Sequence, residues 1–262
     1  MTNQVPTTVV ARATLHHRRS AGKLTPRQLA DLRQAFRAVM ALEDDRGFWY
    51  FAGWHGVPFN WCEHHTELFL PWHRAYLYYF ELALHAQVPG VSLPWWDWTT
   101  ANRIPAAYAA KTADGRQNPL FVRKVHVYRS ASSQTAPARA PGAAPVPPLP
   151  YKQRWDHAMR ATSFGEFQDR IEKLHDDVHV WVGGIMGDIT WAAYDPLFYA
   201  HHVMIDRAWR IWQHRNPGAQ PRQGLLDVAL RPNGMTVRQT LDVKQLGYDY
   251  AGTASHAAGS TP

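Results

Sequence analysis

The sequence has a single cysteine among 262 residues. One cysteine excludes an internal disulfide framework and leaves the redox compartment undefined. Long hydrophobic runs are also missing, because no segment approaches the roughly eighteen apolar residues of a membrane span. Arg18 and Arg19 lie near the start, but no apolar stretch follows them, so neither a secretory nor a twin-arginine signal peptide is predicted. As written, the chain is expected to be cytoplasmic, or exported together with a helper protein.

Charged residues make up only 19 % of the chain and hydrophobic residues 45 %, which is an ordinary globular composition. The formal charge of +7 and the pI near 9.6 are values that nucleic-acid-binding proteins also have. However, the longest basic run is "HHRR" at 16–19, and the other arginines are interspersed with acids. We therefore expect a generally basic surface, with neither a nucleic acid nor a membrane as a partner.

The apolar periodicity predicts helices over 24–42, 66–86, 163–184 and 195–214, with few and short strands. Thr25 and Gln28 are placed to form a capping box at the start of the first helix. The aromatic stretch 91–100 contains Pro94 and is predicted to be a loop packed on the core. We expect one mainly α domain over 1–251, including a Pro/Ala-rich loop at 130–150, and a disordered tail over 252–262.

Fifteen histidines are present, and several have the spacing of metal ligands. His175 and His179 are four residues apart and therefore project from one helical face, with Glu172 on the same stripe. His202 and Asp206 are also four apart, which places a carboxylate where it could orient the second nitrogen of a ligand. Three histidines from two helices would make a trigonal nitrogen site.

The first half of the chain contains a second candidate set. His64 and His73 are nine residues apart, which fits one ligand on a loop and one inside the following helix, and His55 is the natural third member. Two sets of three imidazoles without a carboxylate favour copper over iron, manganese or magnesium, while zinc remains chemically possible. An isolated histidine pair is more often structural, so the prediction depends on the two triplets occurring together.

These segments resemble the copper-binding signatures of the tyrosinase family. "HHTELFLPWHRAYLYYFE" is similar to the first signature, and the matching positions are His64, Phe69, His73, Arg74, Leu77 and Glu81. "DPLFYAHHVMID" is similar to the second signature, in which the latter histidine of the pair, His202, is the ligand. "HDDVHVWVGG", "LPWWDW" and "LGYDY" resemble further family segments, and the resemblance runs from about residue 14 to 251.

The resemblance implies a mainly helical bundle that holds a binuclear type 3 copper centre, with long irregular loops. The first copper would be bound by His55, His64 and His73. The second would be bound by His175, His179 and His202. His65 and His201 adjoin ligands but fall outside the pattern. Two copper ions per chain and O₂ as co-substrate are therefore expected, with a copper-loading helper protein as a possible partner.

Further roles follow from the same resemblance. Cys62 stands two residues before His64, a spacing at which family members carry a thioether between the sulfur and the imidazole; a buried free thiol is the alternative. Ile189 and Val180 match positions that gate the second copper, although both would also suit ordinary core packing.

Two acidic residues concern proton transfer. Glu172 matches the family glutamate that holds a water able to take the phenolic proton. Asp176 stands where members with strong monophenol activity usually have Asn. The safer expectation is therefore oxidation of o-diphenols to o-quinones, with ortho-hydroxylation of monophenols as a possible second activity on small phenolic substrates.

Several alternatives remain. A haemocyanin-like oxygen carrier would share all six ligands, but carriers shield the centre with a further domain, and only about a dozen small residues follow "LGYDY". An o-aminophenol oxidase of secondary metabolism is also compatible. A zinc hydrolase is disfavoured because "HDDVH" lacks the adjacent Glu of the protease motif. A di-iron carboxylate protein would need two Glu-x-x-His motifs, and only Glu172 and His175 provide one.

Overall fold

The computed structural model describes residues 15–121, 124–130 and 133–252. Over these residues the fold is mainly helical, as predicted, with short strands in two-stranded sheets. The α-helices are α1 (Pro26–Met40), α2 (Phe48–His55), α3 (Phe69–Gln87), α4 (Ala106–Ala109), α5 (Lys152–Met159), α6 (Phe164–Val182), α7 (Leu197–Arg215) and α8 (Val237–Thr240). The strands are β1 (His16–Arg18), β2 (Thr112–Ala113), β3 (Arg116–Gln117), β4 (Lys124–His126), β5 (Ser133–Thr135) and β6 (Tyr248–Tyr250). The predicted disordered tail lies, from residue 253 onward, outside the described residues.

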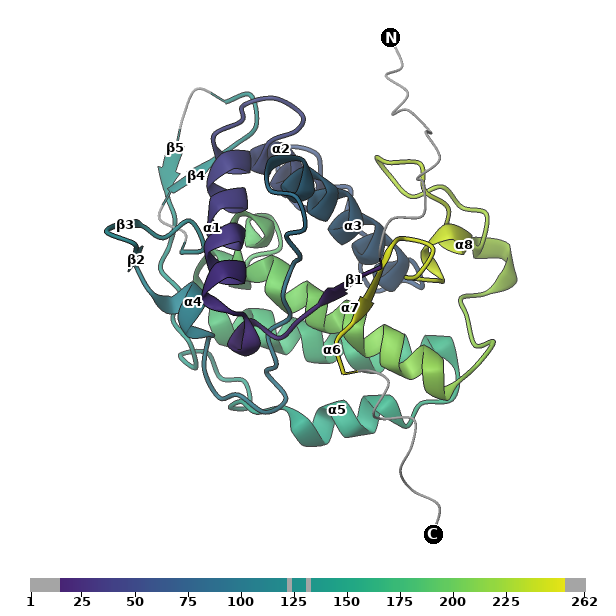
Figure 1. Cartoon of the computed structure of the whole chain (residues 1–262). Helices are drawn as coiled ribbons and strands as arrows, with labels where there is room; N and C mark the ends of the chain where they lie inside the picture. Colours follow the sequence, from purple (N-terminus) through teal and green to yellow (C-terminus); the bar gives the residue numbers. More distant parts are fainter. Residues whose placement is uncertain (1–14, 122–123, 131–132, 253–262) are drawn as a thin grey trace.

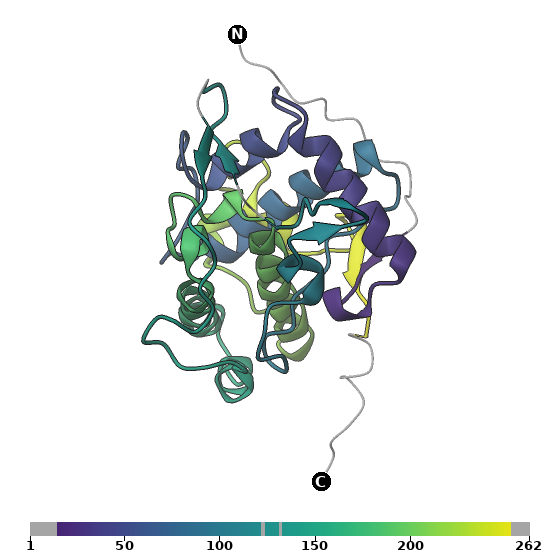
Figure 2. The ribbon, with the colours of Figure 1, turned by 90° about the vertical axis from the view of Figure 1, so that its left-hand side faces the viewer.

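The helices α3 and α7 pack against each other at the centre of the molecule (Figure 1). Helix α1 packs on α3, while α6 packs on α7 and carries α5 on its other side. Figure 2 shows α5 and α6 nearly end-on, with α1 on the opposite side of α7. Strand β1 pairs in parallel with β6, so the two ends of the described chain lie side by side. Among the described residues, no helix is both long and apolar enough to cross a membrane.

The four long helices predicted from the sequence are present within a few residues of the expected bounds. Thr25 and Gln28 form the predicted capping box, with each side chain bonded to the backbone N–H of the other residue. The stretch around Pro94 is irregular, as expected, and buries Trp95, Trp96 and Trp98. Helix α2 was not predicted: its sequence "FWYFAGWH" is apolar almost throughout, so no polar face reveals a helical period.

Gly56 allows α2 to end against the segment that precedes α7. A Cβ at this position would lie 1.9 Å from the carbonyl oxygen of Thr190, so no larger residue fits without moving backbone. The N–H of Val57 donates to the same oxygen at 3.3 Å. His55, the last residue of α2, is thereby held beside the chain around residue 190.

The Pro/Ala-rich segment is mostly exposed over its described residues, 130 and 133–150, but it makes specific contacts with the helical core. Ala140 and Gly142 donate backbone hydrogen bonds to the carbonyls of Val182 and Trp181 at the end of α6, each at 2.8 Å. The side chain of Arg139 is 5 % exposed and forms an ion pair with Asp195, two residues before α7. The segment therefore fastens the end of α6 to the start of α7.

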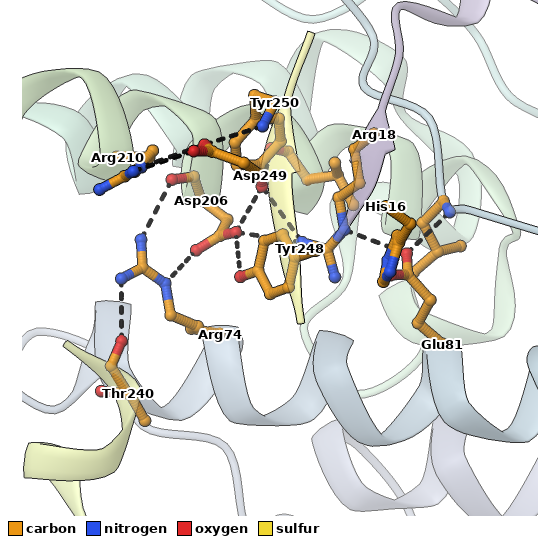
Figure 3. A network of polar contacts seen from close by, with 12 residues as sticks. His16, Arg18, Arg74, Glu81, Asp206, Arg210, Thr240, Tyr248, Asp249 and Tyr250 are labelled. Atoms are coloured by element: carbon orange, nitrogen blue, oxygen red, sulfur yellow. Dashed lines mark hydrogen bonds and ion pairs between the residues drawn. The ribbon is translucent and has the colours of Figure 1, made fainter. Parts of the chain in front are cut away.

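A buried network of charged and phenolic side chains joins β1, α3, α7 and β6 (Figure 3). Its centre is Asp206, which accepts from Arg74 Nε at 2.5 Å, from Arg18 Nη1 at 3.1 Å and from Tyr248 Oη at 2.7 Å. Tyr250 also donates to the Asp206 carboxylate. Burial acts to raise the pKa of Asp206, but the guanidiniums of Arg74 and Arg18 outweigh it and hold the pKa below its ordinary value.

Because this charge is buried and fully compensated, its removal is expected to be costly. Asp206→Asn leaves Arg18 and Arg74 buried without their shared carboxylate and should lower the free energy of unfolding by about 3–5 kcal/mol. The matched control is Asp227→Asn, because Asp227 forms an exposed ion pair with Arg238 and should contribute less than about 1 kcal/mol. Urea denaturation followed by circular dichroism measures both, and equal effects of the two substitutions would contradict the assignment.

Candidate metal centre

The six predicted histidine ligands come together from four helices and one irregular segment. His55 ends α2, His73 lies in the second turn of α3, and His64 lies on the irregular segment before α3. His175 and His179 project from α6 toward His202 on α7. All of them are buried except His64, which is partly exposed.

The second triplet has the geometry of a three-nitrogen metal site. The Nε2 atom of His202 lies 3.1 Å from Nε2 of His175 and 3.1 Å from Nε2 of His179. Nitrogen ligands about 2.0–2.1 Å from one metal ion are about 3.3–3.5 Å apart, so these atoms need to move by only a few tenths of an ångström. Three ring nitrogens face one point.

The first triplet is more loosely drawn together. The ring centroids of His55, His64 and His73 lie 5.0–5.5 Å from one another. The Nε2 atoms of His55 and His73 are buried and have no hydrogen-bond partner in the described part of the chain. A buried polar atom without a partner costs free energy that a bound metal ion would offset. The donor set therefore fits a metal ion here as well.

The outer ring nitrogens hold several of these imidazoles in orientation. His73 Nδ1 donates to the carbonyl of Phe69 at 2.8 Å, and His179 Nδ1 donates to the carbonyl of Met186 at 2.8 Å. His175 Nδ1 lies 3.0 Å from a carboxylate oxygen of Asp176. Such contacts fix the tautomer and direct Nε2 toward the metal.

The environment keeps these imidazoles neutral, which is the form that binds a metal. Burial lowers the pKa of His64 and of His179 to about 4. Burial, followed by the neighbouring imidazoles, lowers the pKa of the remaining four well below its ordinary value; these are His55, His73, His175 and His202.

The two triplets are adjacent. The rings of His73 and His202 are stacked with centroids 4.5 Å apart, and one ring nitrogen each of His55, His73 and His202 lie within 4.8 Å of one another. Two metal ions held in this way would be close neighbours. The arrangement suits chemistry in which both ions act on one small molecule.

His201, which the sequence pattern leaves out, also lies at this centre. It is fully buried, neither of its ring nitrogens has a hydrogen-bond partner, and a nitrogen of its ring lies within 4.8 Å of those of His175, His179 and His202. The adjacent positions of His201 and His202 in the sequence are the only signal that could have drawn attention to it.

Asp206 does not take the position expected from its spacing. Its carboxylate is occupied by Arg18, Arg74 and two tyrosines, and His202 Nδ1 has no hydrogen-bond partner among the described residues. The expected contact with the second nitrogen of His202 was therefore wrong. Two buried guanidiniums attract the carboxylate more strongly than a neutral imidazole does.

Glu172 lies at the edge of the centre. Its Oε1 accepts a hydrogen bond of 2.6 Å from the backbone N–H of His65. Burial raises the pKa of Glu172 to about 7, although the contact with His65 opposes this. A carboxyl group with such a pKa can both accept and release a proton near neutral pH. His65 was not predicted to contribute, and its backbone contact leaves no signal in the sequence.

A cavity of about 160 Å³ opens over the histidines. It is lined by ligand candidates of both triplets together with His65, Asp176, Val180 and Ile189. Val180 and Ile189 are 38 % and 55 % exposed, which is unusual for large apolar side chains in this structure. The structure thus places both predicted gate residues at the mouth of the cavity rather than in the core.

Cys62 lies close to the first triplet. Its Sγ atom and one ring nitrogen each of His55 and His64 lie within 4.8 Å of one another. Burial raises the pKa of the Cys62 thiol to about 11, so the sulfur is a protonated thiol rather than a thiolate.

Comparison with known proteins is consistent with this geometry. The model of the common central domain of tyrosinase matches residues 45–155 and 127–215. The tyrosinase of Streptomyces glaucescens is 33 % identical over 192 residues, which cover 63 % of this chain and 70 % of that protein. Haemocyanin units G and H of Sepia officinalis are 30 % identical over 215 residues, which cover 75 % of this chain but only 37 % of that sequence.

Solved structures agree with these matches. A functional unit of octopus haemocyanin superposes with a TM-score of 0.77 at 28 % identity, covering 91 % of this chain and 68 % of that one. The tyrosinase from Burkholderia thailandensis shares the fold, with a TM-score of 0.75 at 21 % identity, covering 94 % of this chain and 76 % of that one. The chain spans much less than two thirds of the haemocyanin sequences that it matches. With two histidine triplets and the central domain matched over most of its helical core, the chain belongs to the tyrosinase family of type 3 copper proteins.

Proposed function

We propose that this protein binds two copper ions and uses O₂ to oxidise o-diphenols to o-quinones. The observation that carries the proposal is the pair of adjacent triplets of neutral imidazoles beneath a cavity with an apolar mouth. The bound copper pair would supply two-electron redox chemistry and the activation of O₂. The two triplets contain no carboxylate, and this donor set supports copper.

We assign the ligands by their positions in the structure. The first copper is bound by His55, His64 and His73. The second copper is bound by His175, His179 and His202, whose Nε2 atoms already face one point. His202 is preferred over His201 because its Nε2 is the atom that lies 3.1 Å from both histidines of α6.

The residues around the cavity would orient and deprotonate a phenol. Val180 and Ile189 offer apolar surface against which an aromatic ring can pack, and neither carries a charge that would select a charged substituent. Glu172 does not line the cavity itself but contacts the backbone of His65, which does. We assign it as the acceptor of the phenolic proton, because its pKa of about 7 leaves part of the population ionised at neutral pH. Small phenols without a required ionic group are the proposed substrate class.

Asp176 supports diphenol oxidation over monophenol hydroxylation. Its carboxylate is engaged with Nδ1 of His175 at 3.0 Å. A carboxylate held in this way stabilises the ligand histidine, and it is less free to hold a water for Glu172. A monophenol depends more on such a water, because it must be deprotonated before it is hydroxylated.

We further propose that Cys62 and His64 are joined by a thioether. The proximity of the sulfur to the imidazole supports the bond, which would fix the one ligand that lies outside a helix. A C–S bond would replace the S–H bond of Cys62 and one ring C–H bond of His64, and O₂ would be the oxidant that takes up the two hydrogens and two electrons. Intact-mass measurement would show the loss of the hydrogen atoms removed when the bond forms. Quantitative alkylation of Cys62 in the unfolded protein would instead establish a free thiol.

Reversible oxygen binding is the second candidate, favoured by the similarity to haemocyanins. The exposed side chains of Val180 and Ile189 line the cavity over the histidines, and this exposed apolar lining favours catalysis because a phenol can pack against it. Oxidation of an o-aminophenol would use the same cavity and the same proton acceptor.

Turnover assays separate these candidate functions. Copper-loaded protein should convert catechol to its coloured o-quinone with consumption of O₂, and it should act more slowly on tyrosine. Initial rates on catechol, tyrosine and an o-aminophenol give the preference, with the metal-depleted protein as control. Reversible O₂ binding without turnover of any of the three substrates would establish the carrier instead.

Substitution of Asp176 tests its role in substrate preference. Asp176→Asn should raise the rate on tyrosine relative to catechol several-fold, because the amide no longer holds a charge against His175 and can orient a water. Asp177→Asn is the matched control, since Asp177 forms an ion pair with Arg154 away from the cavity. An unchanged ratio in Asp176→Asn would show that this residue does not set the preference.

Substitution of His201 and of His202 tests which of the two binds the second copper. His202→Ala should lose the second copper and retain the first, whereas His201→Ala should retain both. Metal analysis per polypeptide measures the difference, and circular dichroism checks that each variant is folded. Loss of copper from His201→Ala but not from His202→Ala would move the assignment by one residue.

A further inference from the structure

A second group of potential metal ligands lies away from the copper centre. His16 is on β1, while Glu81 and His85 are four residues apart on α3 and therefore share a face of that helix. One ring nitrogen of each histidine and one oxygen of Glu81 lie within 4.8 Å of one another. Glu81 follows His73 by eight residues, which separates the two groups by about 12 Å along the axis of α3.

Glu81 uses its two oxygens differently. Oε2 accepts from Nε of Arg18 at 3.0 Å and from the backbone N–H of Leu93 at 2.8 Å. Oε1 faces Nε2 of His16 at 2.5 Å (Figure 3). The contacts to Oε2 fix the plane of the carboxylate, in the way that outer contacts orient a carboxylate that binds a metal. The other oxygen is presented to the histidines.

His85 supplies the second observation. Its Nε2 is buried and has no hydrogen-bond partner in the structure. The ring packs edge-to-face against His16, with centroids 5.1 Å apart. A buried nitrogen without a partner costs free energy, and this one lies beside a second imidazole and a carboxylate. A metal ion would be a single partner for all three donor atoms.

We propose that His16, Glu81 and His85 bind a zinc ion. Two imidazoles and one carboxylate, with water in the fourth position, form an established donor set for zinc. This set contains a carboxylate, unlike the two triplets of the copper centre, and so favours a different metal. His16 is 25 % exposed, which gives a metal ion and its water access from solvent.

The geometry requires local adjustment, including an approach of His85, whose ring nitrogen lies within 4.8 Å of the other two donor atoms. Ligands about 2.0–2.1 Å from a tetrahedral ion are about 3.4 Å apart, so His16 and Glu81 must separate by about 1 Å and exchange their hydrogen bond for two metal bonds. Arg18 also donates to the carboxylate of Asp206. That negative charge offsets part of the repulsion between Arg18 and a bound metal ion. A bound zinc ion would link β1 to α3 beside the buried network and would have a structural role.

The test uses the full chain after loading with copper, so that the six histidines of the copper centre are occupied. Dialysis against zinc followed by elemental analysis should show one further metal ion per chain. His85→Gln should weaken zinc binding by at least about tenfold, since even the loss of an outer contact has an effect of that size. Zinc should also raise the melting temperature of the unsubstituted protein and not that of His85→Gln.

His17→Gln is the matched control. His17 is the neighbouring residue on β1, is exposed, and points to the opposite side of the strand, so it should leave zinc uptake unchanged. His16→Gln provides a second variant, and unchanged copper content shows that each variant is folded. Absence of zinc uptake by the unsubstituted protein, or unchanged uptake by both His16→Gln and His85→Gln, would overturn the site. If the unsubstituted protein instead binds a third equivalent of copper, and the His16→Gln and His85→Gln variants lose it, the choice of zinc is overturned.

Discussion

The structure depends on burying imidazoles whose inward nitrogens have no other hydrogen-bond partner among the described residues than one another. The Nε2 atoms of His55 and His73 illustrate this, and the Nε2 atom of His202 lies 3.1 Å from those of His175 and His179. In a fully satisfied core such atoms would be paired with hydrogen-bond donors or acceptors. Here the outer nitrogens of several rings are bonded and the inner ones converge, so the fold supplies donors that only a metal ion can use together.

The buried ion pair between α3 and α7 explains how the histidines on these helices are held in place. Arg74 directly follows His73 on α3, and Asp206 lies one turn after His202 on α7. The ion pair between Arg74 and Asp206 therefore fixes the relative position of two helices that each carry one of the proposed metal ligands. The same constraint sets the stacking of His73 on His202, which brings the two triplets together.

Much of the fold and of the site follows from local patterns in the sequence. The periodic apolar stripes predict the long helices, and the spacing of His175 and His179 predicts a shared helical face because both signals arise within one element. Helix α2 was missed because a fully apolar segment has no period. The partner of Asp206 was missed for a different reason, since residue spacing along α7 contains no information about arginines on β1 and α3.

The Pro/Ala-rich segment shows the same limit from another side. Its composition predicts an irregular excursion within one domain. Over its described residues the segment is largely irregular but includes the short strand β5. Composition did not reveal that Arg139 reaches Asp195 or that the backbone near Gly142 bonds to the end of α6. Contacts between segments distant in sequence depend on the assembled fold, and no short motif records them.

The pairing of β1 with β6 has a consequence for biosynthesis. Arg18 leaves the ribosome well before Tyr248 and Tyr250, which complete its surroundings and are translated more than two hundred residues later. All of the histidines assigned to copper are translated before that strand. The nascent chain can therefore expose all six of these histidines while β1 still lacks its partner β6, and the pairing that completes the surroundings of Arg18 forms after them.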